Sequence, residues 1–132
     1  MVALPYFRAK SNERKNTYVE GLLIGVDEEL NLCTIRTKDD YIGGEICYLD
    51  TLSINFPDML DIKGNKIFAS LQENDKGGDI LFDMEYEYTL SFDGLKFNLQ
   101  GLFSQSSFNE FDSWEEFDII GIEEWNQYLY YY

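Results

Sequence analysis

KIFASLQENDKGGDILF, residues 66–82, contains two short apolar segments separated by a polar stretch with two adjacent glycines. The apolar segments are rich in Ile, Leu and Phe and are too short for typical helices, which favours strands. Gly77 and Gly78 tolerate a positive φ and so suit a turn. The stretch therefore predicts two strands joined by a hairpin loop.

Short extended segments separated by turn residues recur along the whole chain. The expected strands cover residues 5–10, 17–26, 32–37, 66–71, 79–92, 95–101 and 117–122. Residues 38–56 continue the pattern, with a turn or bulge at Gly43-Gly44 and an end at Pro57. Frequent turns and few helices predict a mainly β fold, either a small barrel or a curved antiparallel sheet. A chain of 132 residues suits one domain, which we place at residues 1–132.

Asp93-Gly94 is the strongest hairpin signal, because it lies between two alternating runs. The apolar residues of the first arm, expected to face the core, are Met84, Tyr86, Tyr88, Leu90 and Phe92. On the return arm Leu95, Phe97 and Leu99 share one face. Residues 107–114 predict a short helix, with Ser107 as its cap and Glu110 three residues on. Residues 123–132 are expected to form a last helical turn or a tail.

The net charge of −15 is concentrated in one part of the chain. Residues 1–38 hold six Lys/Arg and five Asp/Glu, whereas residues 39–132 hold four and twenty. This acidity opposes binding to nucleic acid or anionic membranes. It either keeps an aromatic-rich chain soluble or forms an acidic face for a basic partner, including the alternative of a nucleic-acid mimic.

The sequence offers little for metal, cofactor or nucleophilic chemistry. It has no histidine, which excludes Ser-His and Cys-His catalysis within the chain. Cys33 and Cys47 are too few for a structural zinc site and are expected to be buried free thiols, with a disulfide as the alternative. We expect no cofactor, no signal peptide and no membrane span, and therefore a cytoplasmic protein.

The polar loop and the C-terminal tail supply the candidate interaction residues. Glu73, Asp75 and Asp79 offer carboxylates, but Lys76 and the flanking strands do not suit a calcium loop. The loop also lacks the helix N-terminus that favours phosphate. The tail residues that we expect to dock on the barrel or on another subunit are Trp125, Tyr128 and Tyr130.

Three stretches resemble the YopX family of phage and prophage proteins. They are Tyr6-Phe7-Arg8-Ala9-Lys10 near the start, residues 61–68 (DIKGNKIF) with Gly78-Asp79-Ile80, and Ile119-Ile120-Gly121-Ile122 near the end. The order is kept over nearly the whole chain, although ASLQENDKGG separates two elements that almost touch in the commoner family pattern. The resemblance implies a mainly β domain with an SH3-like barrel and self-association. The patterns described above add a hairpin at Asp93-Gly94 and one or two short helices to this expectation. It implies no known catalytic activity.

Two classes of function remain. The first is a non-enzymatic accessory protein of phage or prophage origin in a bacterial host cell, which forms homo-oligomers and binds a basic host or phage protein through its acidic surface. The second is a small carboxylate-dependent hydrolase. A pocket with converging acids of shifted pKa favours the hydrolase, whereas a filled barrel with an acidic face favours the binding module.

Overall fold

The computed structural model describes residues 4–37, 43–71, 76–84, 86–101, 105–107 and 113–122. The strands are β1 (Tyr6–Lys10), β2 (Tyr18–Asp27), β3 (Leu32–Arg36), β4 (Glu45–Tyr48), β5 (Ser53–Asn55), β6 (Ala69–Ser70), β7 (Asp79–Asp83), β8 (Tyr86–Phe92), β9 (Phe97–Gln100), β10 (Gln105–Ser107) and β11 (Asp118–Ile122). Two short 3₁₀ turns, η1 (Leu49–Thr51) and η2 (Trp114–Glu116), lie between strands. Within these ranges no helix has the length and apolarity needed to cross a membrane. The mainly β prediction is confirmed.

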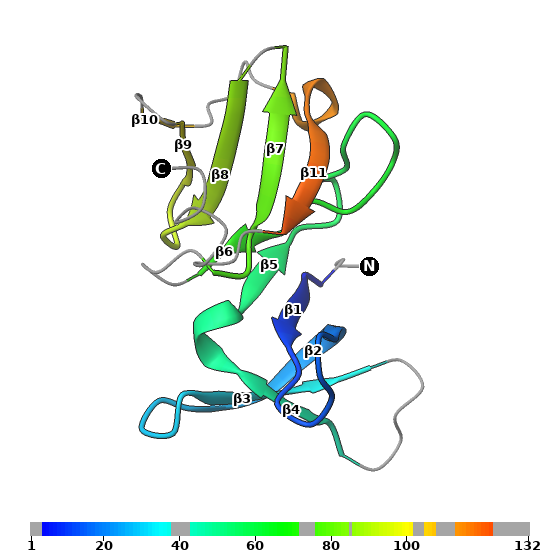
Figure 1. Ribbon diagram of the computed structural model, residues 1–132, viewed down its shortest axis with the longest axis vertical. Coiled ribbons are helices and arrows are strands. Elements are labelled where there is room, and N and C mark those ends of the chain that lie inside the picture. The colour runs from blue at the N-terminus through cyan, green and yellow to red at the C-terminus, as the bar shows by residue number, and fades with distance from the viewer. Residues whose placement is uncertain are drawn as a thin grey trace.

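The strands form one curled, open sheet (Figure 1). Its order is β10-β9-β8-β6-β5-β1-β2-β3-β4, and β7 joins β8 to β11 off this path. At the other end, an antiparallel bridge between Ser11 and Cys47 brings β4 back to the segment after β1. The sheet therefore curls back on itself around β1–β4.

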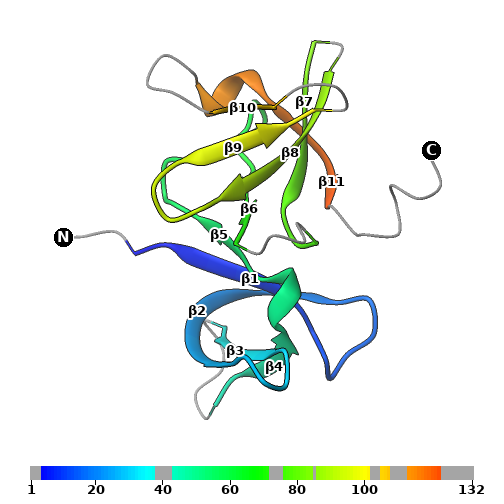
Figure 2. The same ribbon diagram turned by 90° about the vertical axis from the view of Figure 1, so that its left-hand side faces the viewer.

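Two hydrophobic clusters fill the two halves of the molecule, which Figure 2 shows on either side of β1 and β5. The first belongs to β5–β9, β11 and the segments beside them: Ile54, Met59, Ile67, Ala69, Leu81, Leu90, Leu99 and Phe117. The second belongs to β1–β4 and η1: Ala9, Val19, Cys33, Ile35, Cys47, Leu49 and Leu52. Phe7 and Leu71 pack against both clusters and join them. Alternation over residues 32–37 predicts that Cys33 and Ile35 share a buried face, and their exposures of 2% and 0% confirm it.

The segment expected as one strand over residues 79–92 is in fact two strands. β7 and β8 pair antiparallel with Asp83 opposite Tyr86, so the chain reverses at Met84. Met84 has a φ of 59°, which is uncommon for a residue without special backbone freedom. Met84 and Tyr86 are 84% and 63% exposed, so the prediction that they face the core is wrong.

The stretch at residues 66–82 does not form the expected hairpin. β6 pairs with β5 and, in parallel, with β8, whereas β7 pairs with β8 and β11. Gly77 and Gly78 serve close packing, because a Cβ on Gly77 would lie 1.7 Å from Thr51 O and one on Gly78 would lie 2.7 Å from Leu90 O. The positive φ expected there occurs instead at Gly64 and Gly94.

The Asp93-Gly94 hairpin is confirmed between β8 and β9. Gly94 has a φ of 96°, and Asp93 Oδ1 accepts hydrogen bonds from the N–H groups of Leu95 and Lys96. The helix expected from Ser107 is corrected at its start, because Ser107 ends strand β10. Phe108, Glu110 and Phe111 lie outside the described residues.

Candidate functional site

A buried ion pair joins the first strand to the second half of the chain. Arg8 of β1 donates from Nη2 to Asp79 Oδ1 at 2.8 Å and to the carbonyl oxygen of Gly77 at 2.8 Å. Arg8 and Asp79 are only 8% and 1% exposed. Taking two charges out of water is costly, so each charge needs the attraction of the other to be stable inside the protein.

Phe68 holds both members of this pair. Its backbone N–H donates to Asp79 Oδ2 at 2.8 Å, and its ring lies 4.4 Å from the Arg8 guanidinium carbon. A cation over an aromatic face gains electrostatic energy, more so when it is desolvated. Arg8 Nε is enclosed and has no hydrogen-bond partner among the described residues. Because Oδ1 of Asp79 accepts from Arg8 and Oδ2 accepts from Phe68, both carboxylate oxygens are used inside the protein.

The environment of Asp79 raises its pKa above the usual carboxyl value. Burial is the largest cause, and nearby Glu20 adds to it, whereas the Arg8 charge and the Phe68 N–H oppose the rise. A raised carboxyl pKa in a cleft is a common mark of a catalytic acid. Here the carboxylate is nevertheless fully engaged by Arg8 and Phe68, so the geometry does not suit proton transfer to a bound molecule.

A concavity of about 500 Å³ lies over this pair. Arg8, Glu20, Lys66, Phe68 and Asp79 line it together with the strand residues Ile119, Gly121 and Ile122. Lys66 Nζ lies 3.7 Å from a Glu20 oxygen and 4.1 Å from the centre of the Tyr6 ring. The lining has two cations and two anions, so it has no strong preference for one sign of charge.

Asp61 organises a second polar centre, at the turn before Ile67. Its Oδ1 accepts hydrogen bonds from the N–H groups of Lys63 and Asn65, and its Oδ2 accepts one from Ile119 of β11 at 3.3 Å. Burial would raise the pKa of Asp61, but these hydrogen bonds together lower it. Asp61 is a structural carboxylate that fixes the turn against β11.

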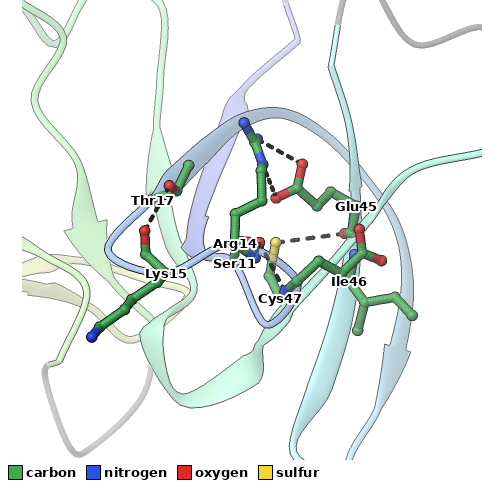
Figure 3. A network of polar contacts seen from close by, with 8 residues as sticks. Ser11, Arg14, Lys15, Thr17, Glu45, Ile46 and Cys47 are labelled. Carbon is green, nitrogen blue, oxygen red and sulfur yellow. Dashed lines mark hydrogen bonds and ion pairs between the residues drawn. The ribbon is translucent and has the colours of Figure 1, made fainter.

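A third polar cluster lies where β4 meets the segment after β1 (Figure 3). Arg14 donates to both carboxylate oxygens of Glu45, at 2.9 and 2.6 Å, and this pair is solvent-exposed. Ser11 Oγ accepts from the N–H groups of Glu13 and Arg14. Cys47 Sγ lies beside this cluster and contacts the carbonyl oxygen of Glu45 at 3.5 Å.

The outward surface of β2 and β4 carries half-exposed apolar side chains. We call Leu22, Ile24, Ile46 and Tyr48 the outer apolar face; the first two are 46% exposed and the other two 39%. Ile24 lies at the bulge where β2 shifts register against β3. Exposed aliphatic side chains gathered on one sheet surface mark interaction sites more often than scattered ones.

The strand register places the outer apolar face on the side of the sheet that also carries Thr34 and Arg36 of β3, and Arg36 lies opposite Leu22. Thr34 of β3 lies between Gly25 of β2 and Ile46 of β4. A Cβ on Gly44 would lie 2.6 Å from Thr34 Cγ2 and 3.1 Å from Ile24 Cδ1, so the Ile24 side chain reaches across β3 toward β4. Thr34 and Ile46 are register partners, so Ile24, Thr34 and Ile46 lie on the same face of the sheet.

Of the predicted interaction residues, only Asp79 lies in the described part of the chain. It is buried against Arg8 and does not present its carboxylate to a partner. Glu73 and Asp75 of the loop lie outside the described residues, as do the tail residues Trp125, Tyr128 and Tyr130. Within the described ranges no three His, Cys, Asp or Glu side chains are grouped to hold a metal ion.

Sequence reasoning missed the partnership of Arg8 with Asp79. The two residues are 71 positions apart, and strand periodicity carries no information on such a pair. The available signal was the set of stretches on which the YopX resemblance rests. Arg8, Phe68 and Asp79 come from three of its elements, and Asp61 contacts Ile119 of the closing one. In this structure those residues hold the fold together.

The chain has no match among family models, among curated proteins or among solved structures.

Proposed function

We propose that this chain is a non-enzymatic protein-interaction module that self-associates through the outer apolar face. The observation that carries the proposal is the placement of Leu22, Ile24, Ile46 and Tyr48 on one face of the sheet, each exposed by about two-fifths or more. Burying the exposed half of such a side chain contributes roughly 1 kcal/mol. Because association also costs translational and rotational freedom, we expect a weak dimer.

The charge distribution supports a second copy as the occupant of this face. Two chains of charge −15 repel one another, but residues 1–38 hold nearly equal numbers of cations and anions. Of the three strands of this surface, β2 and β3 belong to this nearly neutral part and β4 lies near the start of the acidic part, so the contact leaves most of the acidic part outside it. The acidic residues 39–132 remain available to a basic partner, whose encounter they favour by electrostatic steering.

The origin and the finer fold type belong to the same proposal. A phage or prophage accessory role in a bacterial cytoplasm rests on the YopX resemblance alone. The SH3-like barrel is supported by the bridge between Ser11 and Cys47, which curls β1–β4 back on itself. The role of Trp125, Tyr128 and Tyr130 in association stays a prediction. The hydrolase alternative is disfavoured although the pKa of Asp79 is raised, because Asp79 uses both of its oxygens internally. The nucleic-acid-mimic alternative rests on the net charge alone.

Light scattering on single-residue variants tests the self-association. Ile46→Glu and Ile46→Lys place a charge at the centre of the outer apolar face and are both expected to shift the protein to monomer. Leu95→Glu is the matched control, because Leu95 is 94% exposed at the tip of the β8–β9 turn, away from β2 and β4. Equal masses for all the variants and the wild-type protein at dimer-forming concentration contradict the proposal.

A further inference from the structure

The two cysteines lie opposite each other on adjacent strands. Cys33 of β3 and Cys47 of β4 are register partners in an antiparallel pair, and both are free and buried. Directly opposite residues in such a pair project to the same face of the sheet. Both thiols therefore lie on the inner side, in the cluster around Ile35 and Ala9.

The hydrogen bonds beside the pair fix its spacing. Leu49 N donates to Asn31 O at 2.9 Å, two residues from each cysteine. Because hydrogen-bonded and non-hydrogen-bonded pairs alternate along an antiparallel ladder, Cys33 and Cys47 form a hydrogen-bonded pair, with Cα atoms about 5.5 Å apart. Disulfides bridge Cα atoms that are roughly 4.4–6.8 Å apart.

This spacing would strain a disulfide bond between Cys33 and Cys47. Opposite Cβ atoms on paired strands lie up to about 5.5 Å apart, whereas those of a disulfide lie about 3.8 Å apart. β3 and β4 must therefore draw together slightly, and strained disulfides are the readily reduced ones.

We propose that Cys33 and Cys47 form an oxidative modification site, a dithiol that small disulfides of the glutathione type convert to a reversible disulfide joining β3 to β4. Burial raises the pKa of Cys33 to about 11 and, with the Cys33 charge nearby, that of Cys47 to about 12. Few thiolates therefore exist in the closed sheet, and reaction follows local opening. β4 can open because it has only four residues and ends the strand order. Its opening requires that the contacts with Ser11 and Asn12 on its far side are released.

The reaction balances as two thiol–disulfide exchanges. One cysteine loses its proton, and the thiolate attacks a sulfur of the small disulfide, so that a mixed disulfide forms and one small thiolate leaves. The second cysteine, as thiolate, then attacks the cysteine sulfur of the mixed disulfide and expels the other small thiolate. The protein loses two protons and two electrons, and the small disulfide is reduced to two thiols. This inference does not depend on self-association.

The test incubates the folded full chain with oxidised glutathione at mildly alkaline pH. We expect an intact mass lower by two hydrogen atoms, no retained glutathione, and recovery of both thiols with dithiothreitol. A cross-link closing about 15 residues is expected to raise Tm by up to roughly 10 °C, less the strain. Cys33→Ser is the control, and it is expected to show no cross-link and no rise in Tm.

Three outcomes overturn the inference. The first is wild-type protein that keeps both thiols when folded although the same protein oxidises in denaturant. The second is accumulation of a glutathione adduct without the cross-link. The third is a cross-linked protein with a lower Tm than the reduced form, because the native sheet then does not accommodate the bond. All three are measured on the wild-type chain, so the result does not depend on how well a variant folds.

Discussion

Replacing Arg8 by methionine removes the cation from the buried pair while keeping an unbranched side chain of similar length. Asp79 then lies buried without a counter-charge, and the Gly77 carbonyl oxygen loses its side-chain donor. Breaking one side of a buried ion pair costs about 3–5 kcal/mol. For a chain of this size the loss corresponds to a fall in Tm of roughly 10–20 °C.

Arg14→Met is the matched control for this substitution. Arg14 makes an equally short contact to a carboxylate, at 2.6 Å compared with 2.8 Å for Arg8, but its side chain is 58% exposed. Exposed ion pairs contribute little because water and salt screen them. Thermal and urea unfolding are therefore expected to show a large loss for Arg8→Met and almost none for Arg14→Met.

A double variant separates the loss of a counter-charge from a loss of packing. Asp79→Asn is neutral, and its amide oxygen can still accept the Phe68 N–H bond. Added to Arg8→Met, it is expected to restore part of the lost stability, because no bare charge remains buried. The Arg8→Met deficit should also shrink as pH falls: with Arg8 gone, the folded-state pKa of Asp79 rises further, and protonation then favours the folded state. A double variant that is less stable than Arg8→Met, or similar losses for Arg8→Met and Arg14→Met, refutes this reasoning.

Three further predictions concern other parts of the molecule. Asp61→Asn should flatten the fall of the free energy of unfolding at acidic pH. The lowered folded-state pKa of Asp61 stabilises the wild-type protein at pH values above the unfolded pKa of about 3.9, and this stabilisation is lost as the pH falls. Urea unfolding that shows the same acid dependence for both proteins contradicts this prediction. Gly77→Ala should lower Tm markedly, since its Cβ would overlap Thr51 O, whereas Gly43→Ala meets nothing within 4 Å and should not; equal Tm values would refute the close-packing role. Salt should strengthen self-association, because it screens the repulsion between two acidic chains, and should weaken the capture of a basic host or phage protein. A pull-down whose yield does not change with salt argues against capture through the acidic surface.

The sequence predicts most strands of this protein because their signals are local. Alternation over residues 32–37 places Cys33 and Ile35 inside, and Asp93-Gly94 marks the β8–β9 turn. The reversal at Met84 has no such signal, because alternation continues across it and methionine rarely adopts a positive φ. Pairing of β7 with both β8 and β11 imposes that turn, and this pairing is set by the fold as a whole.

Local sequence patterns do not predict the polar centres either, because the partners are far apart in the sequence. The sequence indicates that Gly77 and Asp79 are loop residues, yet Gly77 packs against Thr51 and Asp79 reaches Arg8 on the first strand. Each contact joins positions more than 25 residues apart, where neither period 2 nor turn chemistry specifies a partner. The outer apolar face depends likewise on the bulge at Ile24 and on the register of β2, β3 and β4.

Photo-crosslinking at Tyr48 tests the central claim most directly. A benzoylphenylalanine in place of Tyr48 keeps an aromatic side chain on the outer apolar face, and in a symmetric dimer this face meets its own copy. We expect a crosslinked dimer whose joined peptides come from β2, β3 or β4 of the second chain, and little crosslinking from the same group at Leu95. A protein that remains uncrosslinked at dimer-forming concentrations, or that crosslinks from Tyr48 into residues 76–122 of the second chain, contradicts self-association through the outer apolar face.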